Sequence, residues 1–159
     1  MSELGFVQWQ ALQALYLDCA AALDARELER WPGFFTEDAV YRLQSRENHE
    51  RGLPLAVMAF ESRGMLQDRV YGALQTIYHD PYVQRHILGA PRILEAADGA
   101  WRCEASYLVI RTKRDAMPEV LSVGRTLDRI VATPEGLRFA ERLVLFDNDL
   151  IANSIIDPI

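Results

Sequence analysis

The second half of the chain contains four long segments that favour β-structure, with no helical pattern between them. They run over residues 84–96, 100–113, 120–132 and 137–147. Asp98-Gly99, between the first and second of these segments, is a strong two-residue hairpin signal. Strands that follow one another without helices pair antiparallel, so we predict an antiparallel sheet that is twisted and strongly curved.

The first part of the chain favours helices. Residues 6–23 have apolar side chains at spacings of three and four, which predicts one buried helix face: Leu12, Leu15, Tyr16, Cys19 and Leu23. A second short helix is expected over residues 25–31, with Asp24 as its N-cap and Pro32-Gly33 ending it.

A third helix is expected from Pro54 to about Ile77, because proline suits the first turn of a helix. A short strand over 39–44 and an exposed polar loop over 45–52 precede it. Helices that precede a meandering sheet indicate an α+β fold, with the helices packed on one face of the sheet.

Size and charge limit the class of protein. The chain has 159 residues, half of them hydrophobic and 25% charged, and this predicts a single globular domain over residues 1–159. Its net charge of −6 argues against nucleic acid and against an anionic membrane surface as partners. No basic leader opens the chain and no apolar run approaches the ~20 residues that span a bilayer, so we expect a cytoplasmic protein.

Motifs that carry chemistry are missing from the sequence. Cys19 and Cys103 lie 84 positions apart and are expected to be reduced, buried thiols. His49, His79 and His86 lack metal-ligand spacing, and neither a Gly-x-Ser-x-Gly elbow nor a glycine-rich phosphate loop occurs. We therefore predict no catalytic, cofactor-binding or metal-binding residue in this chain.

General acid–base chemistry stays open as an alternative, because a curved sheet covered by helices can enclose a cavity. Six side chains could point into it: Tyr16, Asp18, Tyr41, Tyr107, His86 and Glu141. The competing interpretation is that each is a satisfied buried group or a surface residue. Glu141 shares an otherwise apolar strand face and is expected to pair with Arg125 or Arg129.

Two regions suggest a subunit interface. Residues 78–86 concentrate aromatic, histidine and arginine side chains, which are typical of recognition loops. The last strand leads into a tail over 147–159 that is rich in isoleucine and leucine and must be buried, in its own fold or against another chain. The candidate interface residues are Tyr78, His79, Tyr82, Arg85, Asp147 and Asn148.

Residues 31–41, Trp-Pro-Gly-Phe-Phe-Thr-Glu-Asp-Ala-Val-Tyr, resemble the early segment of the nuclear-transport-factor-2-like (NTF2-like) superfamily. Within it, residues 63–69, 85–89 and 137–148 resemble the small (beta) subunit of aromatic-ring-hydroxylating dioxygenases. The loop over 47–54 is similar to those of salicylate hydroxylases and terephthalate dioxygenases. The resemblance implies a cone of three helices packed on a curved sheet.

The resemblance also implies a division of labour in aromatic-compound catabolism. Three large (alpha) and three small subunits would assemble, so the partners are large subunits and other copies of this chain. The large subunit would carry a Rieske 2Fe-2S cluster and a mononuclear iron, an NADH-dependent reductase would supply electrons, and the small subunit would be mainly structural.

Two alternatives belong to other functional classes. One is a stand-alone isomerase or dehydratase of the same fold, and the other is a small-molecule binding module. In the isomerases a carboxylate base lies on the first strand or just after it. Residues 41–45 contain no acid, Glu47 is the first to follow, and Asp38 lies in the preceding turn. The enzyme alternative is therefore the weaker interpretation.

Overall fold

The computed structural model describes residues 5–148, 150–152 and 155–159. The elements in chain order are α1 (Phe6–Asp24), the 3-10 helix η1 (Leu28–Phe34), β1 (Phe35–Ser45), α2 (Arg46–Glu50), β2 (Met58–Phe60), α3 (Arg63–Gln75), β3 (Tyr82–Leu88), β4 (Arg92–Ala97), β5 (Ala100–Lys113), β6 (Glu119–Thr133) and β7 (Gly136–Phe146).

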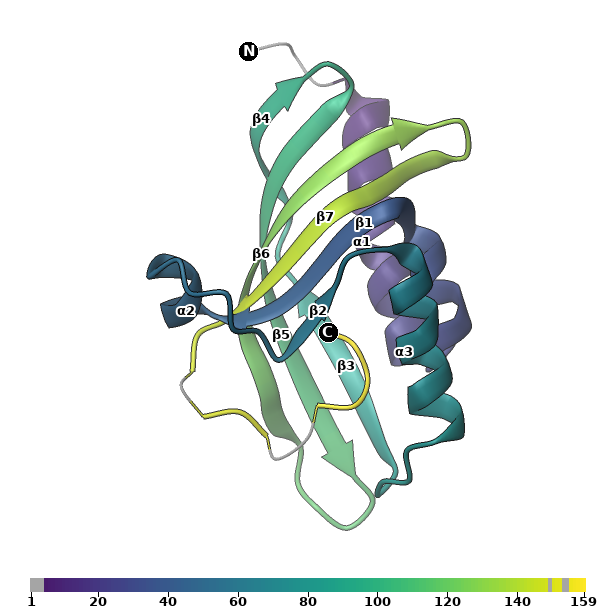
Figure 1. Cartoon of the computed structure of the whole chain (residues 1–159), viewed down its shortest axis with the longest axis vertical. Helices are drawn as coiled ribbons and strands as arrows, with labels where there is room; N and C mark the ends of the chain where they lie inside the picture. The colour runs from purple at the N-terminus through teal and green to yellow at the C-terminus, as the bar shows by residue number, and fades with distance from the viewer. Residues whose placement is uncertain (1–4, 149, 153–154) are drawn as a thin grey trace.

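One curved sheet holds all seven strands, and its order is β2-β1-β7-β6-β5-β3, with β4 also paired to β5. Neighbouring strands are antiparallel except β1 and β7, which run parallel. Helices α1, η1 and α3 lie against one face, which we call the inner face (Figure 1). The expected α+β architecture, with three helices on a mainly antiparallel sheet, is confirmed.

The second helix and the first strand differ from expectation. The helix is a 3-10 helix that starts at Leu28 and includes Pro32-Gly33, and the strand after it begins at Phe35 rather than residue 39. Asp24 is the last residue of α1, not an N-cap, because its carboxylate accepts hydrogen bonds from the backbone N–H of His86 at 3.0 Å. A partner 62 positions away thus overrides the local capping signal.

The third helix is shorter than expected. It starts at Arg63, where the Ser62 side chain accepts a hydrogen bond from the backbone N–H of Met65. The segment over 53–57 has no regular secondary structure instead, and the Val57 N–H donates to the Leu43 carbonyl at 2.7 Å. The loop expected over 45–52 contains the five-residue helix α2.

The segment expected as one strand over 84–96 is two strands. Gly89 interrupts it, with its N–H donating to the Ser106 carbonyl, and buried Pro91 has no N–H to give to a ladder. By contrast, the hairpin at Asp98-Gly99 is confirmed, and both residues adopt the positive φ angles, 51° and 72°, that a tight hairpin turn requires.

A bulge between β6 and β7 changes which side chains face inward. Asp128 pairs with Arg142, and Ile130 with Phe139, so Ala140 is an extra residue in β7. Strict alternation places Phe139 and Glu141 on one face. With the bulge, Phe139 and Arg142 share the inner face and Glu141 is exposed on the opposite, outer face.

Aromatic side chains fill the space between the sheet and the helices. Their rings meet mostly edge to face, with centroids 5.2–5.4 Å apart in the three closest edge pairs. The most completely buried rings are Tyr16, Trp31, Phe35, Tyr41 and Phe139. The inner face is therefore the core of the molecule.

Gly124 marks the closest approach of β6 to the end of β7. A Cβ at this position would overlap the Leu145 carbonyl oxygen and lie 3.0 Å from the Cα of Phe146. We expect Gly124→Ala to lower the free energy of unfolding by about 2 kcal/mol or more, because the contact is with backbone that cannot rotate away. Gly33→Ala is the control, since nothing lies within 4 Å of its Cβ. Urea unfolding of the two variants checks this; equal stabilities would contradict it.

Candidate functional site

The end of the chain folds back and closes the inner face of the sheet (Figure 1). Ile156 and Ile159 are only 7% and 4% exposed. The Tyr41 hydroxyl donates to the Ile159 carbonyl at 2.8 Å and accepts from the Ile159 N–H at 3.2 Å. Arg69 on α3 donates to the carbonyls of Ile155 and Ile156. We call residues 155–159 the plug.

The apolar tail is buried in the chain's own fold only at its end. Residues 155–159 are half-buried or buried in the chain's own fold, whereas Leu150 and Ile151 are exposed. Burial against another subunit is therefore not needed for the last five residues.

Three of the candidate interface residues, Tyr78, His79 and Tyr82, lie in the segment beside the plug. Tyr78 is 98% exposed, and the His79 ring lies 5.3 Å from that of Tyr82. Arg26 joins this loop to the plug, because its Nη2 lies 3.0 Å from His79 Nε2 and 3.7 Å from Asp157 Oδ1. Burial and the nearby Asp157 raise the pKa of Tyr82.

The other candidates lie on different parts of the surface. Arg85 is exposed on β3, 4.0 Å from the Asp24 carboxylate. Asp147 and Asn148 line a hollow beside α2, where Asp147 lies 3.7 Å from Arg46 Nε. Asn148 donates a hydrogen bond to the Leu150 carbonyl. The six residues thus form no single cluster.

The six acid–base candidates do not meet at one site either. Tyr16, Tyr41 and Tyr107 are buried, whereas Asp18 and Glu141 are exposed. His86 is held by Asp24, with Nδ1 2.6 Å from Oδ1. The three tyrosine hydroxyls are also engaged: Tyr41 with the plug, Tyr107 with the Ser122 hydroxyl at 2.8 Å, and Tyr16 with Asp128.

A buried polar cluster lies beneath α1 that the sequence analysis missed. Asp128 Oδ2 accepts hydrogen bonds from the Tyr16 hydroxyl at 2.5 Å and the Thr126 hydroxyl at 2.6 Å. Arg142 Nη1 lies 3.9 Å from Asp128 Oδ1, and both side chains are buried. The guanidinium also stacks over the rings of Phe139 and Tyr16, at 4.5 and 5.4 Å from their centroids.

Burial controls the ionisation of these inner groups. It raises the pKa of Tyr16 and Tyr41, and it raises the pKa of Tyr107 to about 12. It also raises the pKa of Cys19 to about 11 and of Cys103 to about 12, and both thiols are free. Burial raises the pKa of Asp128 as well, with Arg142 opposing it. None of these tyrosines or thiols is poised to titrate near neutral pH.

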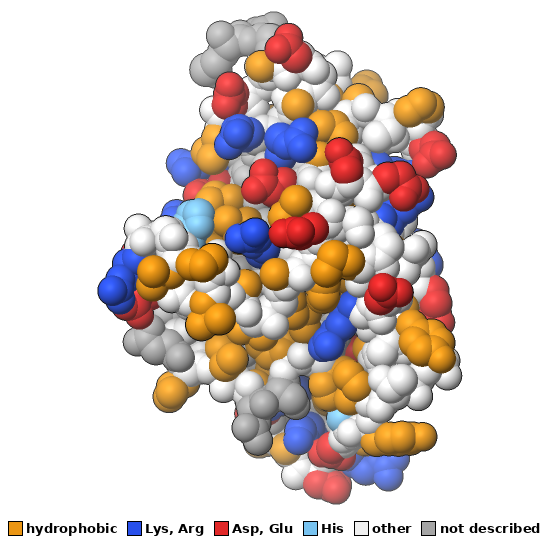
Figure 2. All heavy atoms as spheres, in the orientation of Figure 1, with side chains coloured by type: hydrophobic (Ala, Val, Ile, Leu, Met, Phe, Trp, Pro, Cys, Tyr) orange, Lys and Arg blue, Asp and Glu red, His pale blue; other side chains and the backbone are white. Residues whose placement is uncertain are grey.

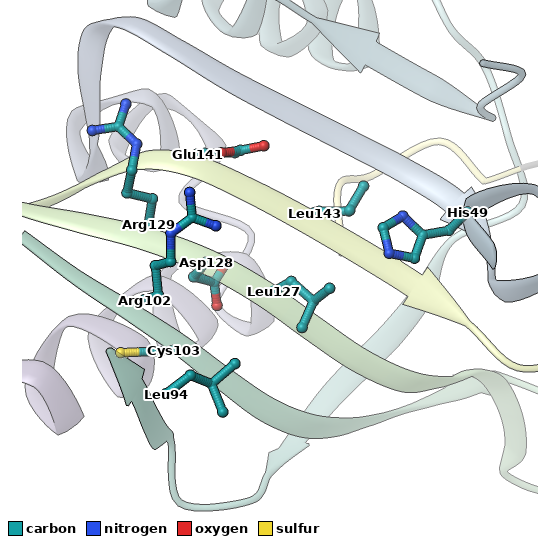
Figure 3. A pocket seen from close by; sticks show the side chains of 9 residues that line it. All are labelled: His49, Leu94, Arg102, Cys103, Leu127, Asp128, Arg129, Glu141 and Leu143. Carbon is teal, nitrogen blue, oxygen red and sulfur yellow. The ribbon is translucent and has the colours of Figure 1, made fainter. Parts of the chain in front are cut away.

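A shallow hollow of about 210 Å³ lies on the outer face, where Figure 2 shows side chains of both charges over the upper strands. Figure 3 shows its lining residues: His49, Leu94, Arg102, Cys103, Leu127, Asp128, Arg129, Glu141 and Leu143. Arg129 and Glu141 are directly opposed across β6 and β7, but in the part of the chain that the structure describes they form no ion pair. Arg125 pairs with Glu104 at 3.4 Å instead of with Glu141.

Over residues 5–148, 150–152 and 155–159, no three His, Cys, Asp or Glu side chains come together as metal ligands would. Within the same residues, none of the helices is both long enough and apolar enough to span a bilayer.

The chain is similar to subunits of ring-hydroxylating oxygenases. Residues 19–153 match the family model described as the ring hydroxylating beta subunit. The small subunit of anthranilate 1,2-dioxygenase from Burkholderia cepacia is 32% identical over 137 residues, which are 86% of this chain and 85% of that protein. Subunit beta 1 of the terminal oxygenase component of terephthalate 1,2-dioxygenase from Comamonas sp. is 30% identical over 142 residues, 89% and 90% of the two chains.

A solved structure extends this similarity to three dimensions. It was determined for a protein from Novosphingobium aromaticivorans and is assigned as the beta subunit of an aromatic-ring-hydroxylating dioxygenase. It aligns with a TM-score of 0.88 at 31% identity, over 96% of this chain and 97% of that one. The expected NTF2-like fold and the resemblance read from residues 31–148 are thus confirmed. The chain belongs to the ring-hydroxylating beta subunit family, the small subunits of aromatic-ring-hydroxylating dioxygenases.

Proposed function

We propose that this chain is the non-catalytic, structural small subunit of a Rieske aromatic-ring-hydroxylating oxygenase. The observation that carries the proposal is the closed inner face. Residues 155–159 occupy the mouth of the cone, and every inward tyrosine hydroxyl among the candidates already has a partner. A stand-alone acid–base enzyme needs titratable groups that a substrate can reach, whereas the Tyr16, Asp128 and Arg142 side chains of the inner face are buried.

The chemical steps of the oxygenase would then take place in the large subunit, the partner of this chain. We propose that three large and three small subunits assemble in the cytoplasm, where an NADH-dependent reductase can supply electrons. The Rieske 2Fe-2S cluster and the mononuclear iron would lie in the large subunit. Anthranilate and terephthalate, named for two relatives, are aromatic carboxylates, and this supports an aromatic acid as the substrate class of the whole enzyme.

The candidate interface residues fit contacts with the large subunit. Tyr78 and Arg85 expose a tyrosine ring and a guanidinium, two of the side-chain types that are enriched at interface hot spots. His79 and Tyr82 support the loop from behind through Arg26. Asp147 and Asn148 would contact the large subunit at a second place, beside α2.

Co-expression with the large subunit tests the proposal. We expect a complex whose native mass equals three large plus three small subunits, and a large subunit that is poorly soluble without this chain. Tyr78→Ala combined with Arg85→Ala should weaken co-purification. Tyr71→Ala is the matched control, because Tyr71 is also largely exposed but lies on α3.

Two outcomes would contradict the proposal. One is an isolated chain that is a stable monomer and does not bind the large subunit. The other is isomerase or dehydratase activity in the isolated chain that is lost in Tyr16→Phe, because the Tyr16–Asp128 pair is where such chemistry would have to occur.

A further inference from the structure

An arginine just after the end of α1 has a backbone conformation that is usual for glycine. The Arg26 N–H donates to the Leu23 carbonyl at 3.0 Å. The Glu27 N–H donates to the Ala22 carbonyl at 2.8 Å, so the two bonds form a Schellman motif. The motif places Arg26 in the left-handed region, with a φ of 57°. Because a Cβ is unfavourable there, an arginine at this position points to a role for its side chain.

The Arg26 guanidinium lies between two segments that are far from each other in the sequence. Its Nη2 is 3.0 Å from His79 Nε2 and 3.7 Å from Asp157 Oδ1. Because an arginine side chain only donates hydrogen bonds, His79 Nε2 accepts this one. The proton of the imidazole is then on Nδ1, which donates to the Asp80 carbonyl at 3.0 Å. One side chain thus bridges the segment before β3 and the plug.

The segment over 77–81 depends on side-chain contacts of this kind. It has no regular secondary structure, and no backbone–backbone hydrogen bond joins it to the rest of the described chain. Its Asp80 carboxylate lies 3.2 Å from Lys113 Nζ, but both side chains are exposed, and such a pair contributes little. The Arg26–His79 contact therefore has a large share in fixing the conformation of this segment.

The other end of the bridge is buried in the plug. The Asp157 side chain is 4% exposed, and its Oδ1 accepts no hydrogen bond from any described residue. Over the same residues, Arg26 is the one cation within 4.0 Å of this carboxylate. A buried carboxylate that loses its cation is strongly destabilising, so the seating of the plug depends on Arg26 as well.

We infer that Arg26 is a positioning residue that couples the segment over 77–81 to the plug. Asp157 holds the guanidinium in place for His79, and His79 holds it in place for Asp157, so order in either segment favours order in the other. The inference rests on the proposed function and deepens it, because the seated plug fixes the conformation in which the exposed Tyr78 meets the large subunit. Coupling is reciprocal, so a large subunit bound at Tyr78 also holds the plug in place.

Changing one segment and measuring the other tests the coupling in the chain alone. His79→Ala leaves the Arg26–Asp157 pair in place, yet we expect it to speed amide hydrogen exchange in the plug about threefold or more. Arg26→Gly removes the bridge and supplies the residue that suits the left-handed conformation. It should speed plug exchange at least about tenfold, and it should also speed chymotrypsin cleavage after Tyr78, which mass spectrometry measures.

Asp98→Gly is the matched control. Asp98 is also a non-glycine residue with a positive φ, 51°, but it is exposed in the turn between β4 and β5. Its replacement relieves the same kind of backbone strain without touching either segment, so both rates should stay native. If Arg26→Gly behaves like this control, or if His79→Ala leaves plug exchange unchanged, the inference is overturned.

The assembled oxygenase gives a second readout. At saturating concentrations of large subunit, we expect plug exchange to slow about threefold or more in the native chain and to stay unchanged in Arg26→Gly, which lacks the bridge. Equal slowing in both chains would mean that the large subunit contacts the plug directly, and this would overturn the inference. If the native chain binds no large subunit, the proposed function fails, while exchange and cleavage in the chain alone still decide the inference.

Discussion

Deletion of residues 155–159 is expected to remove most of the stability of the chain. Ile156 and Ile159 are almost fully buried, and burial of such a side chain contributes about 1.5–3 kcal/mol. The Tyr41 hydroxyl would lose both its hydrogen bonds to Ile159 inside the core, at a further cost of about 1–3 kcal/mol. A domain with about 5–15 kcal/mol in total cannot lose this much without consequence.

Thermal unfolding of the deleted chain measures the effect, and we expect a melting temperature lower by about 10 °C or more. Leu150→Ser and Ile151→Ser are matched controls, because these side chains belong to the same tail but are exposed. They should unfold like the native chain. A deleted chain that unfolds normally but fails to bind the large subunit would show that the plug is an interface segment rather than part of the core.

Strands β5 to β7 could be predicted because the sequence pattern that specifies each of them lies within the strand and its flanking turns. A period of two over eleven or more residues, bounded by turn residues, leaves few alternatives. The Asp98-Gly99 turn is the clearest case, since its two positive φ angles favour those residue types.

The errors in the fold come from contacts between distant residues. Pro54 could open a helix as well as an irregular segment, and the Val57–Leu43 hydrogen bond that ties the segment to β1 joins residues 14 positions apart. The parallel pairing of β1 with β7 has no local signature either, because it joins segments about 100 positions apart. Asp24 fits an N-cap pattern, but its carboxylate is used by His86.

The site was harder to predict than the fold for the same reason. A single extra residue, Ala140, turns Arg142 inward and Glu141 outward, and nothing in the alternation of β7 reveals it. One signal was available: Thr126 and Asp128 alternate with Leu127 and Arg129, so a polar pair on the face opposite the exposed one could have been noticed. The residues proposed for the interface stay predictions.

Arg142→Met is expected to cost about 3 kcal/mol near pH 8, because it removes the cation that faces a buried carboxyl group. Methionine keeps most of the side-chain volume over the rings of Phe139 and Tyr16, so the loss reports charge more than packing. Arg102→Met is the control, since the Arg102–Glu95 pair is exposed on both sides and should contribute less than about 0.5 kcal/mol.

The pH dependence of this cost identifies its origin. In the native chain burial raises the pKa of Asp128 and Arg142 lowers it, so loss of Arg142 raises that pKa further. A carboxyl group whose folded pKa lies above its unfolded value of about 3.9 contributes stability below that pH, and the contribution is lost as pH rises through the folded pKa. The cost of Arg142→Met should therefore be smaller near pH 4 than near pH 8.

Asp128→Asn combined with Arg142→Met separates the effect of charge from that of packing. The asparagine carbonyl can still accept the hydrogen bonds of Tyr16 and Thr126, but it does not titrate. The double variant should recover most of the lost stability at pH 8 and lose the pH dependence, as expected when both members of a buried ion pair are replaced. If the cost of Arg142→Met instead grows on acidification, or persists unchanged in the double variant, the guanidinium stabilises the core by stacking on Phe139 and Tyr16 and not by neutralising Asp128.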